Sequence, residues 1–203
     1  MKIALVGASG AAGSRILTEL SARGHSVTAI ARDASRIAAA PGSTAVSGDA
    51  DQAEAFVGIL AGHDAVVTAL RFADTDAPKL IASVKASGVP RYLVVGGAGT
   101  LEVAPGLALI DAPGFPAAYL AEAKAGGAFL ELLRADSALD WTFLSPSAEF
   151  GPGARTGTFR LGTDQLLVAD TGRSFISYED FAVALADEIE KPRHSRARFT
   201  VGY

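Results

Sequence analysis

Three glycines at fixed spacing follow the first aliphatic segment, and they constrain the fold more than any other feature of the chain. Residues 2–6 read KIALV, which is typical of a buried strand, and residues 7–13 read GASGAAG. An Ala- and Leu-rich stretch follows to about residue 23, and Gly24 is expected to end this helix. A strand that turns through Gly7, Gly10 and Gly13 directly into a helix can bring backbone N–H groups close to a diphosphate.

The remaining chain alternates between short aliphatic segments and helical ones. Strands are expected at 26–31, 44–47, 65–70, 91–95 and 141–144, and helices at about 51–60, 78–87 and 117–134. Such alternation predicts parallel strands joined by right-handed crossovers, with helices on both faces of one sheet. The expected fold class is therefore α/β, a Rossmann-type doubly wound parallel sheet with a small C-terminal substrate-side lobe.

The length of 203 residues fits one domain, and no linker or repeat divides the chain. We expect a single NAD(P)-binding domain over residues 1–203, in which about 146–203 contribute the substrate-side lobe. The Pro- and Gly-rich residues 100–116 are expected to form a loop over the site. Near the C-terminus, a helix at 178–190 capped by Ser177 and a strand at 199–201 are expected.

Charge and composition argue against several classes of partner. The formal net charge of -4 gives no overall attraction to nucleic acid or to an anionic membrane. No apolar run reaches the length of a membrane span, and residues 3–6 are too short for a signal-peptide core, so we expect a cytoplasmic protein. The chain has no Cys, and its three His are scattered, so no metal site is expected.

The end of the second expected strand indicates which dinucleotide is preferred. An acidic residue at this place would bind the ribose 2'-hydroxyl of NAD, but the sequence has Arg32, with Arg36 one turn later. Cations there suit a 2'-phosphate, so NADP(H) is favoured over NAD(H). In the alternative, Arg32 is a solvated surface residue and Asp33 turns toward the ribose.

Asp49 follows the third expected strand and has two interpretations. It is either an adenine contact or the N-cap of the helix expected from Asp51.

Four further segments resemble one family. They read KIALVGASGAAGSRI, YLVVGGAGTL, LDWTFLSPS and ISYEDFAVALADEIE. Together they resemble the atypical short-chain dehydrogenase/reductases of the NmrA-like, biliverdin-reductase-B-like NAD(P)H-binding group, which includes flavin reductases. The resemblance implies that NAD(P)H lies across the carboxyl ends of the strands. The cofactor-binding residues that it implies, together with the glycine loop, are Gly7, Ala8, Ser9, Gly10, Ala11, Ala12, Gly13, Ala69, Leu70, Arg71, Gly97, Pro146 and Ser147.

The sequence departs from ordinary dehydrogenases at the proton donor. Members of the larger superfamily resemble one another in a Ser and a Tyr-x-x-x-Lys pair, but here Tyr119 and Lys124 are five residues apart. The extra residue turns the two side chains about 100° further apart around a helix. Thr100 is the only hydroxyl near the place of the family Ser. Thr100, Tyr119 and Lys124 are the candidate catalytic residues, although Tyr119 can equally be a packing aromatic and Lys124 a solvated surface residue.

A flavin acceptor such as FMN or riboflavin relaxes the need for that donor, because water can supply the proton. The first hypothesis is therefore an NAD(P)H-dependent reductase of a flavin or a related flat acceptor. Its expected partner is a small-molecule electron acceptor, and we expect a monomer or a homodimer. Phe150, Arg155, Thr156 and Phe159 form either a wall for that acceptor or an ordinary connection. The alternative function is a non-catalytic NmrA-like redox sensor. A nucleotide-sugar epimerase is disfavoured because it needs the missing Tyr-x-x-x-Lys.

Overall fold

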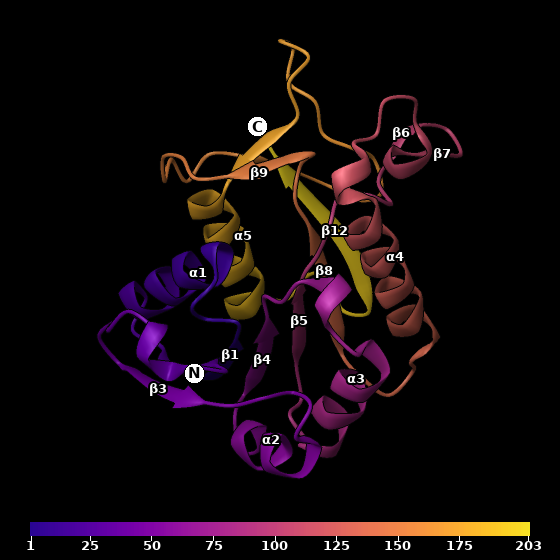
Figure 1. Ribbon diagram of the computed structural model, residues 1–203. Coiled ribbons are helices and arrows are strands. Elements are labelled where there is room, and N and C mark those ends of the chain that lie inside the picture. The colour runs from indigo at the N-terminus through magenta and orange to yellow at the C-terminus, as the bar shows by residue number, and fades with distance from the viewer.

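A mixed but mostly parallel sheet of eight strands crosses the centre of the computed structural model, which describes all 203 residues (Figure 1). The strand order is β10-β12-β8-β5-β4-β1-β2-β3, and only β10 runs antiparallel to its neighbour. This order confirms the doubly wound Rossmann-type sheet. The strands are β1 (Lys2–Val6), β2 (Ser26–Ala31), β3 (Ser43–Ser47), β4 (Ala65–Thr68), β5 (Tyr92–Val95), β8 (Trp141–Ser145), β10 (Arg160–Gly162) and β12 (Ala197–Gly202).

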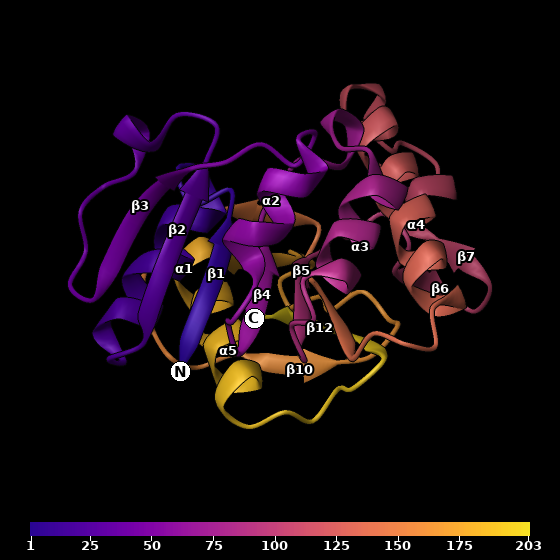
Figure 2. The same ribbon diagram turned by 90° about the horizontal axis from the view of Figure 1, so that it is seen from below.

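Five helices cover the two faces of this sheet (Figures 1 and 2). Helices α1 (Ala11–Ala22) and α5 (Tyr178–Glu190) lie side by side on one face. Helices α2 (Ala53–Leu60), α3 (Ala77–Ala86) and α4 (Leu120–Ala135) lie on the other. The alternation of side chains along β1 explains the two layers: Ile3 and Leu5 belong to one buried cluster, whereas Ala4 and Val6 belong to the second.

The segment expected to be a loop, residues 100–116, contains a small hairpin. Its strands are β6 (Glu102–Ala104) and β7 (Leu107–Ala108), and Gly106 turns between them with φ of +75°. A 3-10 turn, η3 (Leu109–Asp111), follows. The backbone N–H of Glu102 also donates to Asp164, and Leu166 donates back to Glu102. The hairpin is therefore held by a segment distant in sequence, which is why local composition did not predict it.

The helix expected at 117–134 begins later than its sequence pattern indicated. Residues Ala117–Tyr119 form a separate 3-10 turn, η4, and α4 begins at Leu120. The fourth strand ends at Thr68 instead of residue 70, because the chain leaves the sheet there and enters the 3-10 turn η2 (Phe72–Asp74). Tyr119 consequently precedes α4 and is not part of its regular turns.

Residues 146–203 complete the core as well as extending the carboxyl end of the sheet. Strand β12 lies between β8 and β10, and α5 packs against α1. A second, two-stranded parallel sheet consists of β9 (Glu149–Gly151) and β11 (Phe175–Ser177). Ser177 caps α5 as predicted, since its hydroxyl accepts a hydrogen bond from the N–H of Asp180 at 2.9 Å. None of the helices is long and apolar enough to cross a membrane.

Candidate functional site

The glycine loop follows β1 with a geometry that only glycine permits at two of its positions. Gly7 has φ of +86°, and a Cβ built on it would lie 2.3 Å from the carbonyl oxygen of Ala69. A Cβ on Gly13 would lie 2.1 Å from the carbonyl oxygen of Gly7. Gly10 is less restricted, with 3.2 Å to that same oxygen. The glycines therefore allow α1 to start in direct contact with the loop after β1.

This loop presents free hydrogen-bond donors at the start of α1. The N–H groups of Ala8 and Gly10 are used internally, on Ile30 and Gly7. Those of Ser9, Ala11 and Ala12 have no partner in the chain, and no acidic residue occupies the first turn of α1. Free N–H groups at the positive end of a helix dipole attract phosphate. The loop thus fits the diphosphate of a dinucleotide, with no side chain of its own blocking the cradle.

The end of β2 carries cations without protein partners. Arg32 and Arg36 are both exposed, and neither makes an ion pair or hydrogen bond through its side chain. Asp33 is committed elsewhere: its Oδ1 accepts from the N–H of Ser35 at 3.0 Å and from the Ser35 hydroxyl at 2.6 Å. The hydroxyl of Ser35 is the main reason that the pKa of Asp33 lies below its usual range. Asp33 therefore stabilises the 3-10 turn η1 (Ala34–Arg36).

Asp49 shapes the connection between β3 and α2. Its Oδ1 accepts a hydrogen bond from the N–H of Asp51 at 3.0 Å. Helix α2 begins only at Ala53, and the residue before it, Gln52, makes no side-chain cap. The expectation that Asp49 caps a helix starting at Asp51 is therefore wrong, because three residues separate Asp49 from the first residue of α2. An adenine contact by Asp49 stays a prediction.

The loop after β4 lies against the glycine loop, and a contact of Ala69, Leu70 and Arg71 with the dinucleotide stays a prediction. Ala69 continues the contact of β4 with β1, because its N–H donates to Val6 at 2.8 Å and its carbonyl faces Gly7. Leu70 is half-buried. The side chain of Arg71 is 73% exposed and pairs only with Asp74, which is 64% exposed, at 3.3 Å.

The loop after β5 depends on a glycine that sequence reasoning missed. A Cβ on Gly96 would lie 2.3 Å from the ring of Phe143, whereas Gly97 has nothing closer than Phe72 at 3.9 Å. Gly96 is therefore required for packing, and Gly97 is free to face a ligand. The adjacent pair of glycines was visible in the sequence, but the partner ring on β8 was not.

The three candidate catalytic side chains make no hydrogen bonds with one another. Thr100 accepts a hydrogen bond at its hydroxyl from Nη1 of Arg198 on β12, at 2.8 Å. Tyr119 is 65% exposed and makes no side-chain hydrogen bond. Lys124 is exposed on α4 without an ion-pair partner. No pair among the three forms the hydrogen bond that a proton-donating dyad requires.

Pro146 and Ser147 follow β8 and are buried. The Ser147 hydroxyl donates to the carbonyl oxygen of Val201 at 3.1 Å. A Cβ on Gly202 would lie 2.4 Å from that hydroxyl oxygen. Ser147 therefore joins β8 to the end of β12, and a contact with the nicotinamide carboxamide stays a prediction.

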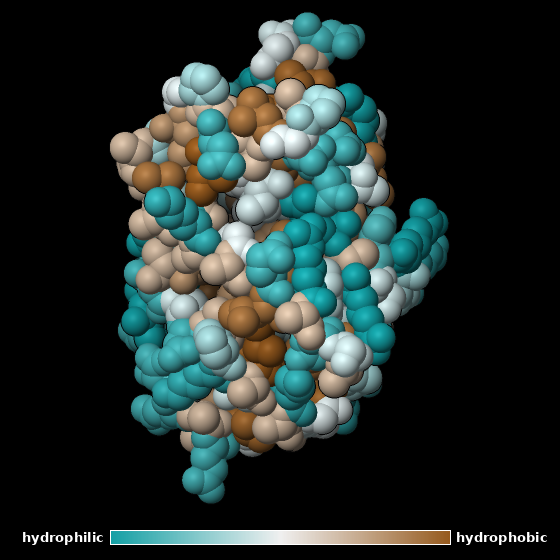
Figure 3. Space-filling model, turned by 90° about the vertical axis from the view of Figure 1, so that its right-hand side faces the viewer, coloured by the Kyte–Doolittle hydropathy of each residue, from teal (hydrophilic) through white to brown (hydrophobic).

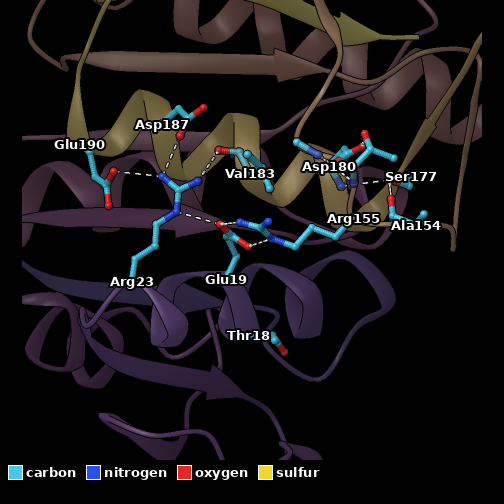
Figure 4. A network of polar contacts seen from close by, with 12 residues as sticks. Thr18, Glu19, Arg23, Ala154, Arg155, Ser177, Asp180, Val183, Asp187 and Glu190 are labelled. Carbon is cyan, nitrogen blue, oxygen red and sulfur yellow. Dashed lines mark hydrogen bonds and ion pairs between the residues drawn. The ribbon is translucent and has the colours of Figure 1, made fainter.

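The residues considered for an acceptor wall pack or bond within the chain instead, and Figure 4 shows Arg155 turned toward Glu19 on α1. Arg155 makes two hydrogen bonds to the Glu19 carboxylate, at 2.7 and 2.8 Å. Thr156 donates its N–H to Asp180 at 2.9 Å. Phe150 packs on Tyr178 and Phe181, with ring centroids 4.6 and 4.7 Å apart, and Phe159 packs against the same core. These contacts favour the second alternative for this segment, an ordinary connection within the chain, over a wall for the acceptor.

A doubly wound parallel sheet with a glycine cradle at the carboxyl end of its first strand defines a Rossmann-type dinucleotide-binding protein. The chain belongs to the NAD(P)H-binding family, whose model matches residues 7–192.

Three solved structures show how closely the whole fold is shared. A "putative exported protein" from Burkholderia pseudomallei is 43% identical, with a TM-score of 0.91 and full coverage of both chains. A "putative epimerase" from Bacteroides thetaiotaomicron is 41% identical, with a TM-score of 0.94 over 100% of this chain and 96% of that one. A "putative NADH-flavin reductase" from Streptococcus pneumoniae is 36% identical, with a TM-score of 0.84 over 100% and 99%.

Proposed function

We propose that this protein is an NADPH-dependent reductase that passes a hydride to a flavin or a related flat acceptor. The observation that carries the proposal is the combined donor set at the carboxyl ends of β1 and β2. It consists of the free N–H groups of Ser9, Ala11 and Ala12 together with the unpaired cations Arg32 and Arg36. When bound, the dinucleotide supplies the hydride, and the chain binds and orients it.

The preference for the phosphorylated dinucleotide follows from charge at the end of β2. Arg32 and Arg36 form no ion pair, and Asp33 accepts its hydrogen bonds from Ser35. A charge-assisted hydrogen bond from Arg to a 2'-phosphate contributes about 1.5–3 kcal/mol, or roughly tenfold or more in affinity. The related flavin reductase is named for NADH, so the two arginines are the basis for proposing a different preference here.

The choice of a flavin acceptor rests on the lack of any hydrogen bond among the side chains of Thr100, Tyr119 and Lys124. A carbonyl substrate needs a positioned proton donor during hydride transfer, and these side chains form no dyad. A flavin takes the hydride without one, because its remaining proton comes from water. The 36% identity to the protein named as a "putative NADH-flavin reductase" supports the same acceptor class.

Two other functions have specific observations in their favour. The relative named as a "putative epimerase" is 41% identical, yet the absent Tyr–Lys contact argues against nucleotide-sugar epimerisation in this chain. A non-catalytic redox sensor needs only the glycine cradle and accounts equally well for the missing dyad. Tight dinucleotide binding without turnover would favour the sensor.

The partners, the location and the oligomeric state of the protein are also part of the proposal. The net charge of -4 supports a small-molecule acceptor without nucleic-acid or membrane partners. We propose a cytoplasmic monomer or homodimer, although one relative is named as a "putative exported protein".

One kinetic experiment tests the cofactor and the acceptor together. Wild-type protein and Arg32→Ala are assayed for NADPH and NADH oxidation with FMN, riboflavin and a quinone panel. We expect NADPH turnover with a flavin, and an Arg32→Ala loss in kcat/KM of about tenfold for NADPH but little for NADH. Arg134→Ala, at an exposed arginine on α4, serves as the control. No turnover with any acceptor contradicts the reductase, and equal losses for both dinucleotides contradict the role of Arg32.

A further inference from the structure

Glu122 on α4 holds the loop that follows β4 through both carboxylate oxygens. Oε1 accepts from the N–H of Phe72 at 2.8 Å, and Oε2 accepts from the N–H of Ala73 at 2.9 Å. Glu122 makes no other hydrogen bond and no ion pair. A carboxylate that accepts two backbone N–H bonds forms a strong, directional contact, because both bonds are charge-assisted.

The ring of Phe72 holds the same loop by packing against α4 and the sheet. It lies 5.3 Å from the ring of Phe129 on α4 and stacks at 5.9 Å on Phe143 of β8, measured between centroids. A Cβ on Gly126 would lie 3.0 Å from the Phe72 ring. The lack of a side chain at Gly126 therefore lets the ring pack directly on α4. Phe72 is thus fixed through its ring by α4 and the sheet, and through its backbone by Glu122.

The fastened loop reaches the glycine cradle within three residues. Ala69 faces Gly7 through its carbonyl oxygen, and residues 70 and 71 connect it to Phe72. In the sheet, β4 adjoins β1 on the side opposite β2. Since Arg32 and Arg36 place the adenosine half over β2, the other half of a dinucleotide extends over β4 and its loop.

We propose that Glu122 is a positioning residue for the nicotinamide half of the dinucleotide, acting through the backbone of residues 69–73. This inference rests on the proposed function. Glu122 touches no ligand itself; its carboxylate keeps the loop after β4 in one conformation, so that a bound dinucleotide does not have to order it. Removing the clamp leaves the glycine cradle and the two arginines intact, and therefore penalises only one half of the ligand.

The test compares two ligands that differ in this half. NADPH and adenosine 2',5'-bisphosphate, which lacks the nicotinamide, are titrated calorimetrically into wild-type protein, Glu122→Gln and Glu131→Gln. The Gln variant presents an NH2 group to one of the two N–H donors, so one bond is lost at nearly constant volume. We expect NADPH to bind about tenfold more weakly to Glu122→Gln, and the bisphosphate to change by less than about twofold. Glu131, an exposed carboxylate on the same helix, is the matched control.

A second readout reports the clamp without any ligand. Amide hydrogen exchange of a peptide covering Phe72 and Ala73 should be faster in Glu122→Gln than in wild type. If Glu122→Gln does not fold, Glu122→Asp replaces it. Asp keeps the charge but is one methylene too short to make both bonds at once, so NADPH should again be weakened more than the bisphosphate. Equal weakening of both ligands, no weakening of NADPH, or unchanged exchange would each overturn the inference. Failure of wild-type protein to bind NADPH would instead overturn the proposed function, and the inference with it.

Discussion

Gly13 and Gly58 both lie inside helices, yet an added methyl group meets opposite surroundings at the two positions. On Gly13 it would lie 2.1 Å from the Gly7 carbonyl oxygen, whereas on Gly58 it meets nothing within 4 Å. We expect Gly13→Ala to lower the free energy of unfolding by about 1–3 kcal/mol through overpacking. Gly58→Ala should raise it by about 0.5–1 kcal/mol, because Ala loses less backbone entropy in a helix.

Urea unfolding followed by circular dichroism measures both variants, and an NADPH titration of each shows whether the cradle survives. Gly13→Ala should lose dinucleotide binding, while Gly58→Ala retains it. A Gly13→Ala protein as stable as wild type and with normal binding would show that α1 does not need its close approach to the loop.

Single residues differ in how far the sequence predicts their role. Gly13 was predictable because its constraint is local, arising within the turn from β1 to α1. Gly7 was predictable from the same turn, where it has a positive φ, although the close approach of Ala69 to Gly7 depends on the folded chain. Gly96 was not, because its constraint comes from the Phe143 ring on another strand. The hydroxyl of Thr100 was visible in the sequence, but its bond to Arg198 on β12 depends on the folded chain. Glu122 carried no motif at all, since its partners are backbone N–H groups.

At the scale of elements, Glu19 ties α1 to α5 and to the segment before β10 (Figure 4). Its side chain is 6% exposed and accepts bonds from Arg155 and from Arg23, which also contacts Asp187 and Glu190 on α5. The hydrogen bond from Arg155 holds the pKa of Glu19 below its ordinary value of 4.5, with Arg23 adding to the effect and burial opposing it.

The sign of the resulting pH dependence follows from that lowered pKa. A carboxyl group with a lower pKa in the folded state adds stability above its unfolded pKa, and this stability is lost as the pH falls through the folded pKa. We expect the difference in free energy of unfolding between wild type and Glu19→Gln to be constant above about pH 5.5 and to shrink below 4.5. Denaturant titrations at a series of pH values measure it. Glu54→Gln, on the exposed face of α2, should show no such trend, and a flat difference for Glu19→Gln would refute the linkage.

Among the elements, regular strands and helices were predicted better than their connections. The buried strands β1, β2 and β5 are short and mostly apolar, and α5 has its Ser177 cap and amphipathic spacing. The β6–β7 hairpin was missed because Glu102 pairs with residues 164–166, a partner that local propensity cannot reveal. Likewise, Arg155 was considered for an acceptor wall, although Glu19 on α1 draws it away from the carboxyl edge.

At the scale of the whole molecule, the alternation of strands and helices was sufficient to predict the parallel sheet. A terminal strand at 199–201 was also expected, but its place inside the sheet was not. Strand β12 comes last in the chain and yet lies inside the sheet, between β8 and β10. On the side that carries α3, α4 and the β6–β7 hairpin, hydrophobic residues form separate groups among hydrophilic ones (Figure 3). A surface of this kind gives no extended apolar patch on that side for a partner to cover.

The position of β12 predicts that residues 146–203 cannot be removed as a separate lobe. They supply Ile176, Phe181, Leu185 and Phe199 to the buried cluster beneath α1, so a chain of residues 1–145 would leave the apolar sides of α1 and β8 open to water. We expect this fragment to unfold without cooperativity, to bind the dye ANS and to show no NADPH binding, because its remaining core is too small on that face.

The fragment and the full-length protein are compared by three measurements. Thermal unfolding reports cooperativity, ANS fluorescence reports exposed apolar surface, and calorimetry reports NADPH binding. Removal of Tyr203 alone is the control. This change deletes the Tyr203 contacts with Asp180, Ser177, Phe175 and Arg160 but retains β12, and it should lower the melting temperature by only a few degrees. If the 1–145 fragment unfolds cooperatively and binds NADPH, its strands alone suffice to hold the glycine cradle. The C-terminal residues would then serve the acceptor side and not the core, as an accessory lobe does.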